Sequence, residues 1–156
     1  MGRDIHVKIV KLDQTTNKWK NVKLYSKKNR KFKIINPYSF RNYELFDILN
    51  GKEDDKYILS PIIISSLPLD LQQEIKKCKD TCGYYGFYEI NLADLKLYLN
   101  KVPKIRDYDY EDDDPKAWKD NPVKFFIENI EYYIDFAEPY WNGLYSNIRI
   151  IYWFDC

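Results

Sequence analysis

Three side chains near the two ends of the chain have types and spacing that suit acid–base or metal chemistry: Asp4, His6 and Asp155. Asp4 and His6 are two residues apart in an alternating segment, so in a strand they project from the same face. If the last strand pairs antiparallel with the first, Asp155 lies near Asp4. A histidine between carboxylates can act as a general base, or the three groups can bind a metal ion.

Two further residues are expected at the same edge. Arg41 and Asn42 begin the next predicted helix, and we assign both to binding, with Arg41 as an anion clamp. The hypothesis is a small nucleotide- or metal-binding enzyme site; the alternative is a structural polar network in which His6 and Arg41 hold the carboxylates. The sequence has no Walker loop, Gly-x-Gly-x-x-Gly or Gly-x-Ser-x-Gly pattern, and we expect no cofactor.

An acidic segment, residues 107–114, carries six carboxylates in eight positions. Because like charges repel, this density predicts an exposed loop. The loop can be simply solvated, or bind a cation, although the EF-hand spacing and glycine are missing. It can also imitate nucleic-acid phosphate on a partner's basic groove, with aromatic anchors between the charges. The binding residues we assign to it are Tyr108, Asp109, Tyr110, Asp112 and Asp113.

The three cysteines give little chemistry. Cys78 and Cys82 have a spacing that some zinc ligands show, but no second Cys-x-x-Cys pair accompanies them and His6 is the only histidine. The odd count predicts no disulfide framework, and free thiols suit a reducing cytoplasm.

Charge is unevenly distributed along the chain. Residues 1–35 contain eleven basic and two acidic side chains, a net charge of +9, which leaves −8 for the remainder of a chain whose net charge is +1. A basic segment of this kind meets nucleic acid, an acidic partner, or the acidic half of its own chain. Trp19, Tyr25 and Phe32 lie among the basic residues and can stack on single-stranded bases. No RNP motif or helix-turn-helix pattern is present.

Hydrophobic periodicity predicts the elements that must position these groups. Alternation favours a strand at 5–12 with a hairpin partner at 18–25, and a third strand at 31–35. The apolar run at 147–156 lacks polar alternation, which is typical of a central strand covered on both faces. Helices are expected at 42–50, 67–79, 91–100 and 122–136.

These elements predict an α+β fold: an antiparallel sheet of about four strands, made of the N-terminal meander and the C-terminal strand, with helices packed on one face. A length of 156 residues is typical of a single domain, 1–156. No apolar run approaches the length of a membrane helix, and the N-terminus lacks the apolar region of a signal peptide, so we expect a cytoplasmic protein without membrane contact.

Several blocks resemble a family of uncharacterised phage and bacterial proteins. Met1–His6 is similar to that family's Met-Gly-x-Asp-Ile-His signature, and Arg41–Phe46 to its Arg-Asn-Tyr-x-Leu-Phe block. The other blocks that match are Leu67-Pro68, Leu92–Leu95 and Arg149–Asp155. The family has a histidine-rich turn before the Leu92–Leu95 block, whereas residues 83–88 here contain no histidine, so no metal or catalytic role of that turn is carried over.

The resemblance implies a phage or prophage setting. We therefore expect an accessory protein that acts by binding a host protein or ribonucleoprotein and blocks a defence system, as an anti-CRISPR inhibitor does. The alternatives are the enzyme centred on Asp4, His6 and Asp155, with a small nucleotide as ligand, and direct nucleic-acid binding through the basic meander.

Overall fold

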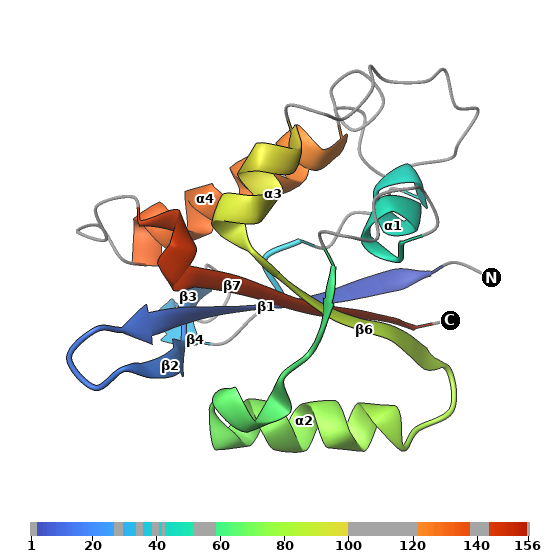
Figure 1. Ribbon diagram of the computed structural model, residues 1–156, viewed down its shortest axis with the longest axis horizontal. Helices are drawn as coiled ribbons and strands as arrows, with labels where there is room; N and C mark the ends of the chain where they lie inside the picture. Colours follow the sequence, from blue (N-terminus) through green and yellow to red (C-terminus); the bar gives the residue numbers. More distant parts are fainter. Residues whose placement is uncertain are drawn as a thin grey trace.

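The strand at the C-terminal end, β7 (Ile148–Asp155), lies in the middle of an antiparallel sheet with the order β2-β1-β7-β6-β5 (Figure 1). Its neighbours are β1 (Asp4–Asp13) and β6 (Tyr84–Asn91). The apolar run that makes up β7 has both faces buried, as its lack of alternation predicts. The α+β class and the central position of this strand are therefore confirmed.

The computed structural model describes residues 3–26, 30–33, 36–38, 41, 43–51, 59–99, 122–137 and 144–155. The short edge strands of the main sheet are β2 (Lys18–Asn21) and β5 (Ser60–Pro61), and a separate two-stranded sheet consists of β3 (Leu24–Ser26) and β4 (Lys31–Lys33). The helices are α1 (Tyr43–Leu49), α2 (Leu69–Lys79), α3 (Leu92–Leu99) and α4 (Pro122–Ala137). No helix in these ranges is long and apolar enough to cross a membrane.

Helices cover both faces of the sheet, so the prediction that they pack on one face is wrong. Ile5, Val7 and Ile9 of β1 belong to the larger core, which also contains the buried residues of α1, α3 and α4. Val10 and Trp153 belong to a smaller core on the opposite face, against α2 (Figure 1). Successive side chains of β1 and β7 point to opposite faces of the sheet, so each strand contributes residues to both cores.

The N-terminal meander is split between two sheets, which corrects the expectation that it supplies most of the main one. β2 pairs with β1 only from Val10 to Asp13, and the chain then turns so that Val22 and Leu24 enter the larger core. β3 and β4 pair with each other and contact α4. The expected single strand over 18–25 is therefore two short strands.

β6 was not expected, because residues 83–88 have the composition of a turn. The strand contains a bulge between Tyr85 and Tyr88, which breaks the two-residue alternation. Gly86 sits in the bulge with φ +66°, and a Cβ atom there would lie 2.7 Å from both Asn50 and Phe154 side-chain atoms. Only glycine fits this position without a shift of its neighbours.

Local signals place the helix ends close to where the sequence predicts them. Asn91 caps α3 by accepting a hydrogen bond from the Ala93 N–H at 2.8 Å. Gly51, just beyond α1, has the positive φ (+71°) of a C-terminal glycine. Pro68 is the residue before α2 rather than part of its first turn.

Candidate functional site

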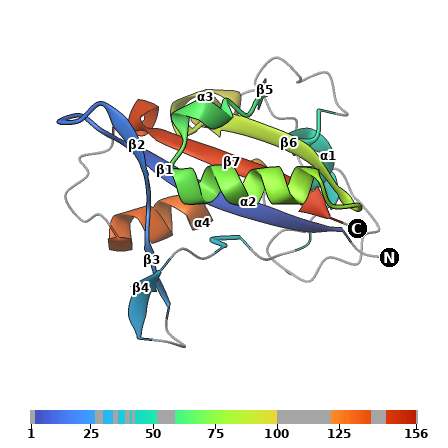
Figure 2. The same ribbon diagram turned by 90° about the horizontal axis from the view of Figure 1, so that it is seen from below.

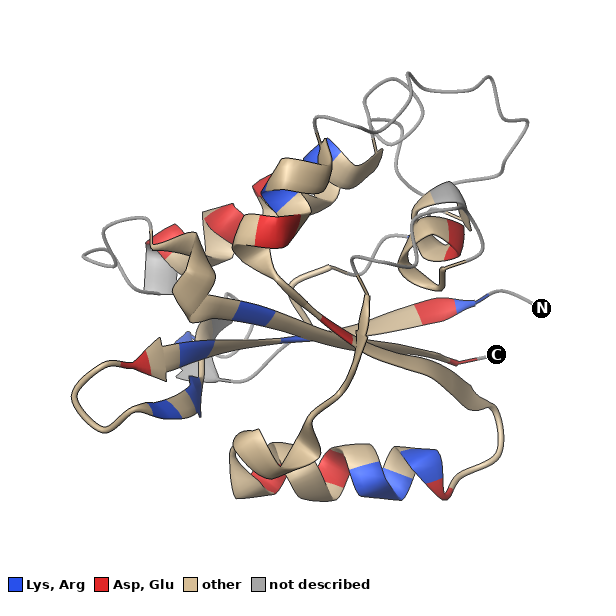
Figure 3. Ribbon diagram, in the orientation of Figure 1, with Lys and Arg blue, Asp and Glu red and all other residues tan. Residues whose placement is uncertain are grey.

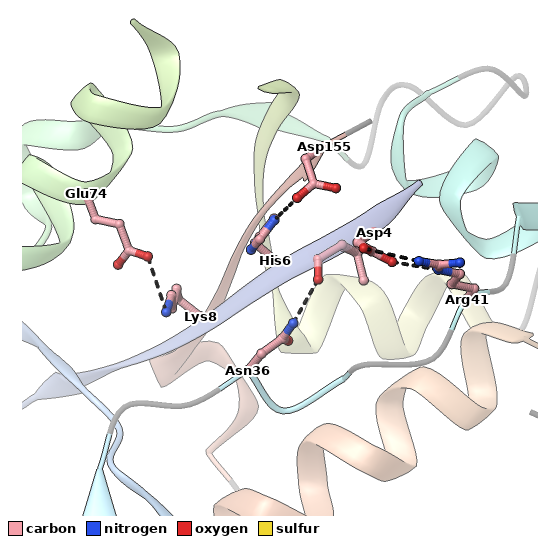
Figure 4. A network of polar contacts seen from close by, with 8 residues as sticks. Asp4, His6, Lys8, Asn36, Arg41, Glu74 and Asp155 are labelled. Carbon is pink, nitrogen blue, oxygen red and sulfur yellow. Dashed lines mark hydrogen bonds and ion pairs between the residues drawn. The ribbon is translucent and has the colours of Figure 1, made fainter. Parts of the chain in front are cut away.

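The two ends of the chain lie side by side at one rim of the sheet, as the antiparallel pairing of the first and last strands predicts. Asp4 pairs with Asp155, and His6 with Trp153, in the β1–β7 register. The His6 Nε2 lies 2.7 Å from Asp155 Oδ2 (Figure 4), and both side chains are about two-thirds buried, with 35% and 27% exposed. We call Asp4, His6, Arg41 and Asp155 the edge cluster.

Within the edge cluster, Asp4 contacts Arg41 rather than sharing the histidine. Arg41 donates from Nε to Asp4 Oδ1 at 2.7 Å and from Nη2 to Oδ2 at 3.4 Å (Figure 4). This hydrogen-bonded guanidinium is the main reason that the pKa of Asp4 lies below its usual value. Arg41 therefore holds a carboxylate of its own chain at the place where the sequence suggests an anion clamp.

An aromatic stack lies beneath His6 on the α2 face of the sheet. The His6 ring is stacked on Trp153, with 5.7 Å between centroids, and is tilted against Tyr84 at 5.8 Å. Phe87 stacks on Trp153 in turn, and Lys79 lies over the Phe87 ring. These rings were not among the predicted site residues, although alternation from Asp155 back to Trp153 places both on one face. The stack fixes the orientation of the imidazole.

α2 brings two more reactive side chains to this face. Glu74 lies 3.4 Å from Lys8 Nζ as an ion pair (Figure 4), and Cys78 is partly buried nearby. Burial, and after it the Glu74 carboxylate, raise the pKa of the Cys78 thiol. A raised pKa disfavours the thiolate, which is the nucleophilic form, so the environment does not activate this cysteine.

Metal binding receives no support from the described part of the chain. In it, no three His, Cys, Asp or Glu side chains are grouped so that they could hold a metal ion. Cys82 is exposed and Cys78 packs against the smaller core, so they form no ligand set with His6.

A groove lies at the opposite end of the same sheet face. Its volume is about 440 Å³, and its lining residues are Asn17, Lys18, Trp19, Ser65, Ser66, Leu67 and Pro68. Arg149 of β7 lies beneath it, 4.8 Å from the centroid of the Trp19 ring. The Arg149 guanidinium donates to Glu89 and, at 2.8 Å, to the Ser66 hydroxyl. This buried ion pair was not predicted from the sequence.

Six of the predicted binding residues lie outside the described part of the chain. They are Asn42, Tyr108, Asp109, Tyr110, Asp112 and Asp113. The hypotheses for the acidic segment 107–114 therefore stay predictions.

No protein-family model, curated protein or solved structure matches this chain significantly. The edge cluster consists of two polar contacts, a hydrogen bond between His6 and Asp155 and an ion pair between Arg41 and Asp4. A third pair beside them, Arg3 with Asp47 at 3.1 Å, attaches the start of β1 to α1.

Proposed function

We propose that this chain is a phage- or prophage-encoded accessory protein that acts by binding and not by catalysis. The observation that carries the proposal is that Arg41, the predicted anion clamp, is already paired with the Asp4 carboxylate of the same chain at 2.7 Å. This contact and that of His6 with Asp155 stabilise the junction of the first strand, the last strand and the segment before α1. On this view the edge cluster is a structural clasp.

The proposed partner is a host protein or ribonucleoprotein of a defence system. The phage setting comes from the resemblance of the Met1–His6 and Arg41–Phe46 blocks. The uneven charge of the chain supports action through a surface, because charged surfaces speed association with partners of opposite charge and select among them.

The test has two stages. The chain is first expressed in a panel of bacterial strains that each carry one defence system, and the plating efficiency of a sensitive phage is measured; we expect a rise of at least tenfold with one system. The purified chain is then titrated against the purified complex of that system. A binder inhibits up to a fixed molar ratio, whereas inhibition by a small fraction of an equivalent would point to turnover. No rise with any system would contradict the anti-defence role.

A second candidate function is an enzyme that uses Asp4, His6 and Asp155 on a small nucleotide. The observation in its favour is the 2.7 Å contact between His6 and Asp155, since a carboxylate that orients an imidazole is a common arrangement for a general base. Thermal-shift measurements with a nucleotide panel test it. A shift that the His6→Gln substitution abolishes would favour the enzyme.

A further inference from the structure

A long segment that includes most of the basic meander contains no acidic residue. Between Gln14 and Tyr43 the sequence has nine basic side chains and neither aspartate nor glutamate. A stretch of 30 residues with this composition concentrates positive charge wherever the fold places it.

The fold places residues 14–26 and 30–33 of this stretch at one end of the molecule, whereas Arg41 lies at the opposite rim with Asp4. Those two ranges contain β2 and the two-stranded sheet β3–β4, which in Figure 2 lies at the periphery, beyond α4 and away from the main sheet. Val22 and Leu24 are buried and hold β3 against the larger core. The basic side chains are thus carried on an anchored element.

Four cations at this end are exposed and unneutralised. Lys18, Lys23, Arg30 and Lys31 are exposed, and no ion pair joins any of them to an acid in the described ranges. Among the helix acids, Glu131 of α4 pairs with Lys96, and Asp70 of α2 accepts hydrogen bonds from Asn21 of β2 at 3.0 and 3.1 Å. Figure 3 shows further Asp and Glu residues on α4. Within the described ranges, no acid of the other half of the chain forms an ion pair with these four residues. We call them, together with β2, β3 and β4, the basic end.

The groove beneath Trp19 adjoins the basic end, since Lys18 belongs to both. The Trp19 ring is half-buried and rests on the Arg149 guanidinium, which Glu89 and Ser66 hold in place. Hydroxyl and amide groups of Asn17, Ser65 and Ser66 surround it. A fixed aromatic ring beside polar groups and a lysine suits a nucleobase with its phosphate.

We propose that the basic end binds single-stranded nucleic acid, with phosphates on the four exposed cations and a base in the groove against Trp19. This inference rests on the proposed function, because it specifies that the part of the partner that the chain contacts is single-stranded nucleic acid. A single strand is favoured over a duplex because a base must leave its stack to enter a groove of about 440 Å³.

The experiment is a fluorescence-anisotropy titration of the full chain with labelled 20-nucleotide oligo(U) and oligo(dT) between about 50 and 300 mM salt. We expect binding that weakens steeply with salt, with a log–log slope that falls by about 0.7 for each cation removed. Lys23→Glu/Lys31→Glu should weaken binding at least tenfold. The matched control, Lys76→Glu/Lys77→Glu on the exposed side of α2, changes the net charge equally and should weaken it less than threefold.

The aromatic contact is tested separately with Trp19→Leu, which should weaken binding at least fivefold with circular dichroism unchanged. If this substitution perturbs the fold, Lys18→Ala probes the same groove and should weaken binding at least threefold. Preference for oligo(U) or for oligo(dT) would identify RNA or DNA as the source of the strand.

Three results would overturn the inference: no binding to either oligonucleotide at the lowest salt, an equal loss in the α2 control, or displacement by polyglutamate as effective as by unlabelled oligonucleotide, which would indicate an acidic protein. Stoichiometric inhibition of a defence complex together with any of these would leave the proposed function standing and remove only the nucleic-acid partner.

Discussion

Among single residues, the two partners of the buried ion pair under the groove, Arg149 and Glu89, have the largest predicted effect on stability. Arg149 and Glu89 are only 8% and 9% exposed, and the carboxylate also accepts a hydrogen bond from the Ile63 N–H at 3.2 Å. Removing two charges from water has a high free-energy cost, which the pair offsets only while both partners and their hydrogen bonds are present.

Replacing one partner should therefore destabilise the protein strongly. For Arg149→Met we expect the free energy of unfolding to fall by about 3–5 kcal/mol, because the Glu89 carboxylate is left buried and unpaired. Urea denaturation at 25 °C measures it. In Arg149→Met/Glu89→Leu the lone charge is gone, and most of the loss should be recovered. If the free energy of unfolding of Arg149→Met lies within about 1 kcal/mol of the wild-type value, the Glu89 carboxylate reaches water and the account is wrong.

Residue spacing alone predicts the contact between His6 and Asp155, because both strands are strongly patterned and their antiparallel pairing follows from the fold class. It does not predict that Asp4 turns to Arg41, or that Trp153 and Tyr84 flank the imidazole. Those contacts depend on β6 and on the path of the chain before α1, and neither leaves a local signal in the sequence.

At the scale of elements, β6 shows why a strand can escape sequence analysis. Its bulge puts two residues opposite one and shifts the alternation, and Gly83 and Gly86 give the segment the composition of a turn. The choice of sheet face for α2 is equally hidden, because its apolar stripe would fit either face. Packing between distant segments decides both.

The bulge in β6 requires glycine at position 86, which predicts a loss of stability on substitution. Gly86→Ala should lower the free energy of unfolding by more than about 2 kcal/mol, because the new Cβ atom meets Asn50 and Phe154 and the positive φ is strained. Gly83→Ala is the matched control, since Gly83 has φ +97° but no atom within 4 Å of the added Cβ. Thermal unfolding of the two variants separates steric overlap from backbone strain; equal losses would refute the close contact.

The β1–β2 turn should contribute to acid sensitivity. Hydrogen bonds from Lys20 and from the Thr15 and Thr16 N–H groups lower the pKa of Asp13 from 3.8 to about 2. Between these values the unfolded chain binds the proton and the folded chain does not, so stability from this group is complete above pH 3.8 and is lost as pH falls toward 2.

We therefore expect the thermal unfolding midpoint of Asp13→Asn to fall less steeply than that of wild type as the pH decreases from about 4 to about 2. Lys20→Met, which removes the main hydrogen-bond partner, should flatten the same part of the curve. Parallel curves for all three proteins would show that the turn does not hold Asp13 in this way.

For the whole molecule, the structure separates two regions along the sheet. At one rim the ion pairs of Arg3 and Asp4 and the hydrogen bond of His6 join the chain ends and α1. At the other end, Lys18 and Trp19 line a groove, and Lys23, Arg30 and Lys31 are exposed on the adjoining strands and turns. In the first region the charged side chains pair with one another, whereas in the second Lys18, Lys23, Arg30 and Lys31 form no ion pair with a described acid. We therefore propose that the first region is structural and that the second meets the partner.

The most direct test of binding without catalysis is to compare His6→Gln with wild type in the titration against the inhibited defence complex. Glutamine keeps a hydrogen-bond donor toward Asp155 but cannot serve as a general base. Once thermal unfolding shows the variant to be folded, the account predicts inhibition at the same molar ratio as wild type, within about twofold. Loss of inhibition by the folded variant would contradict it and place the chemistry at the edge cluster.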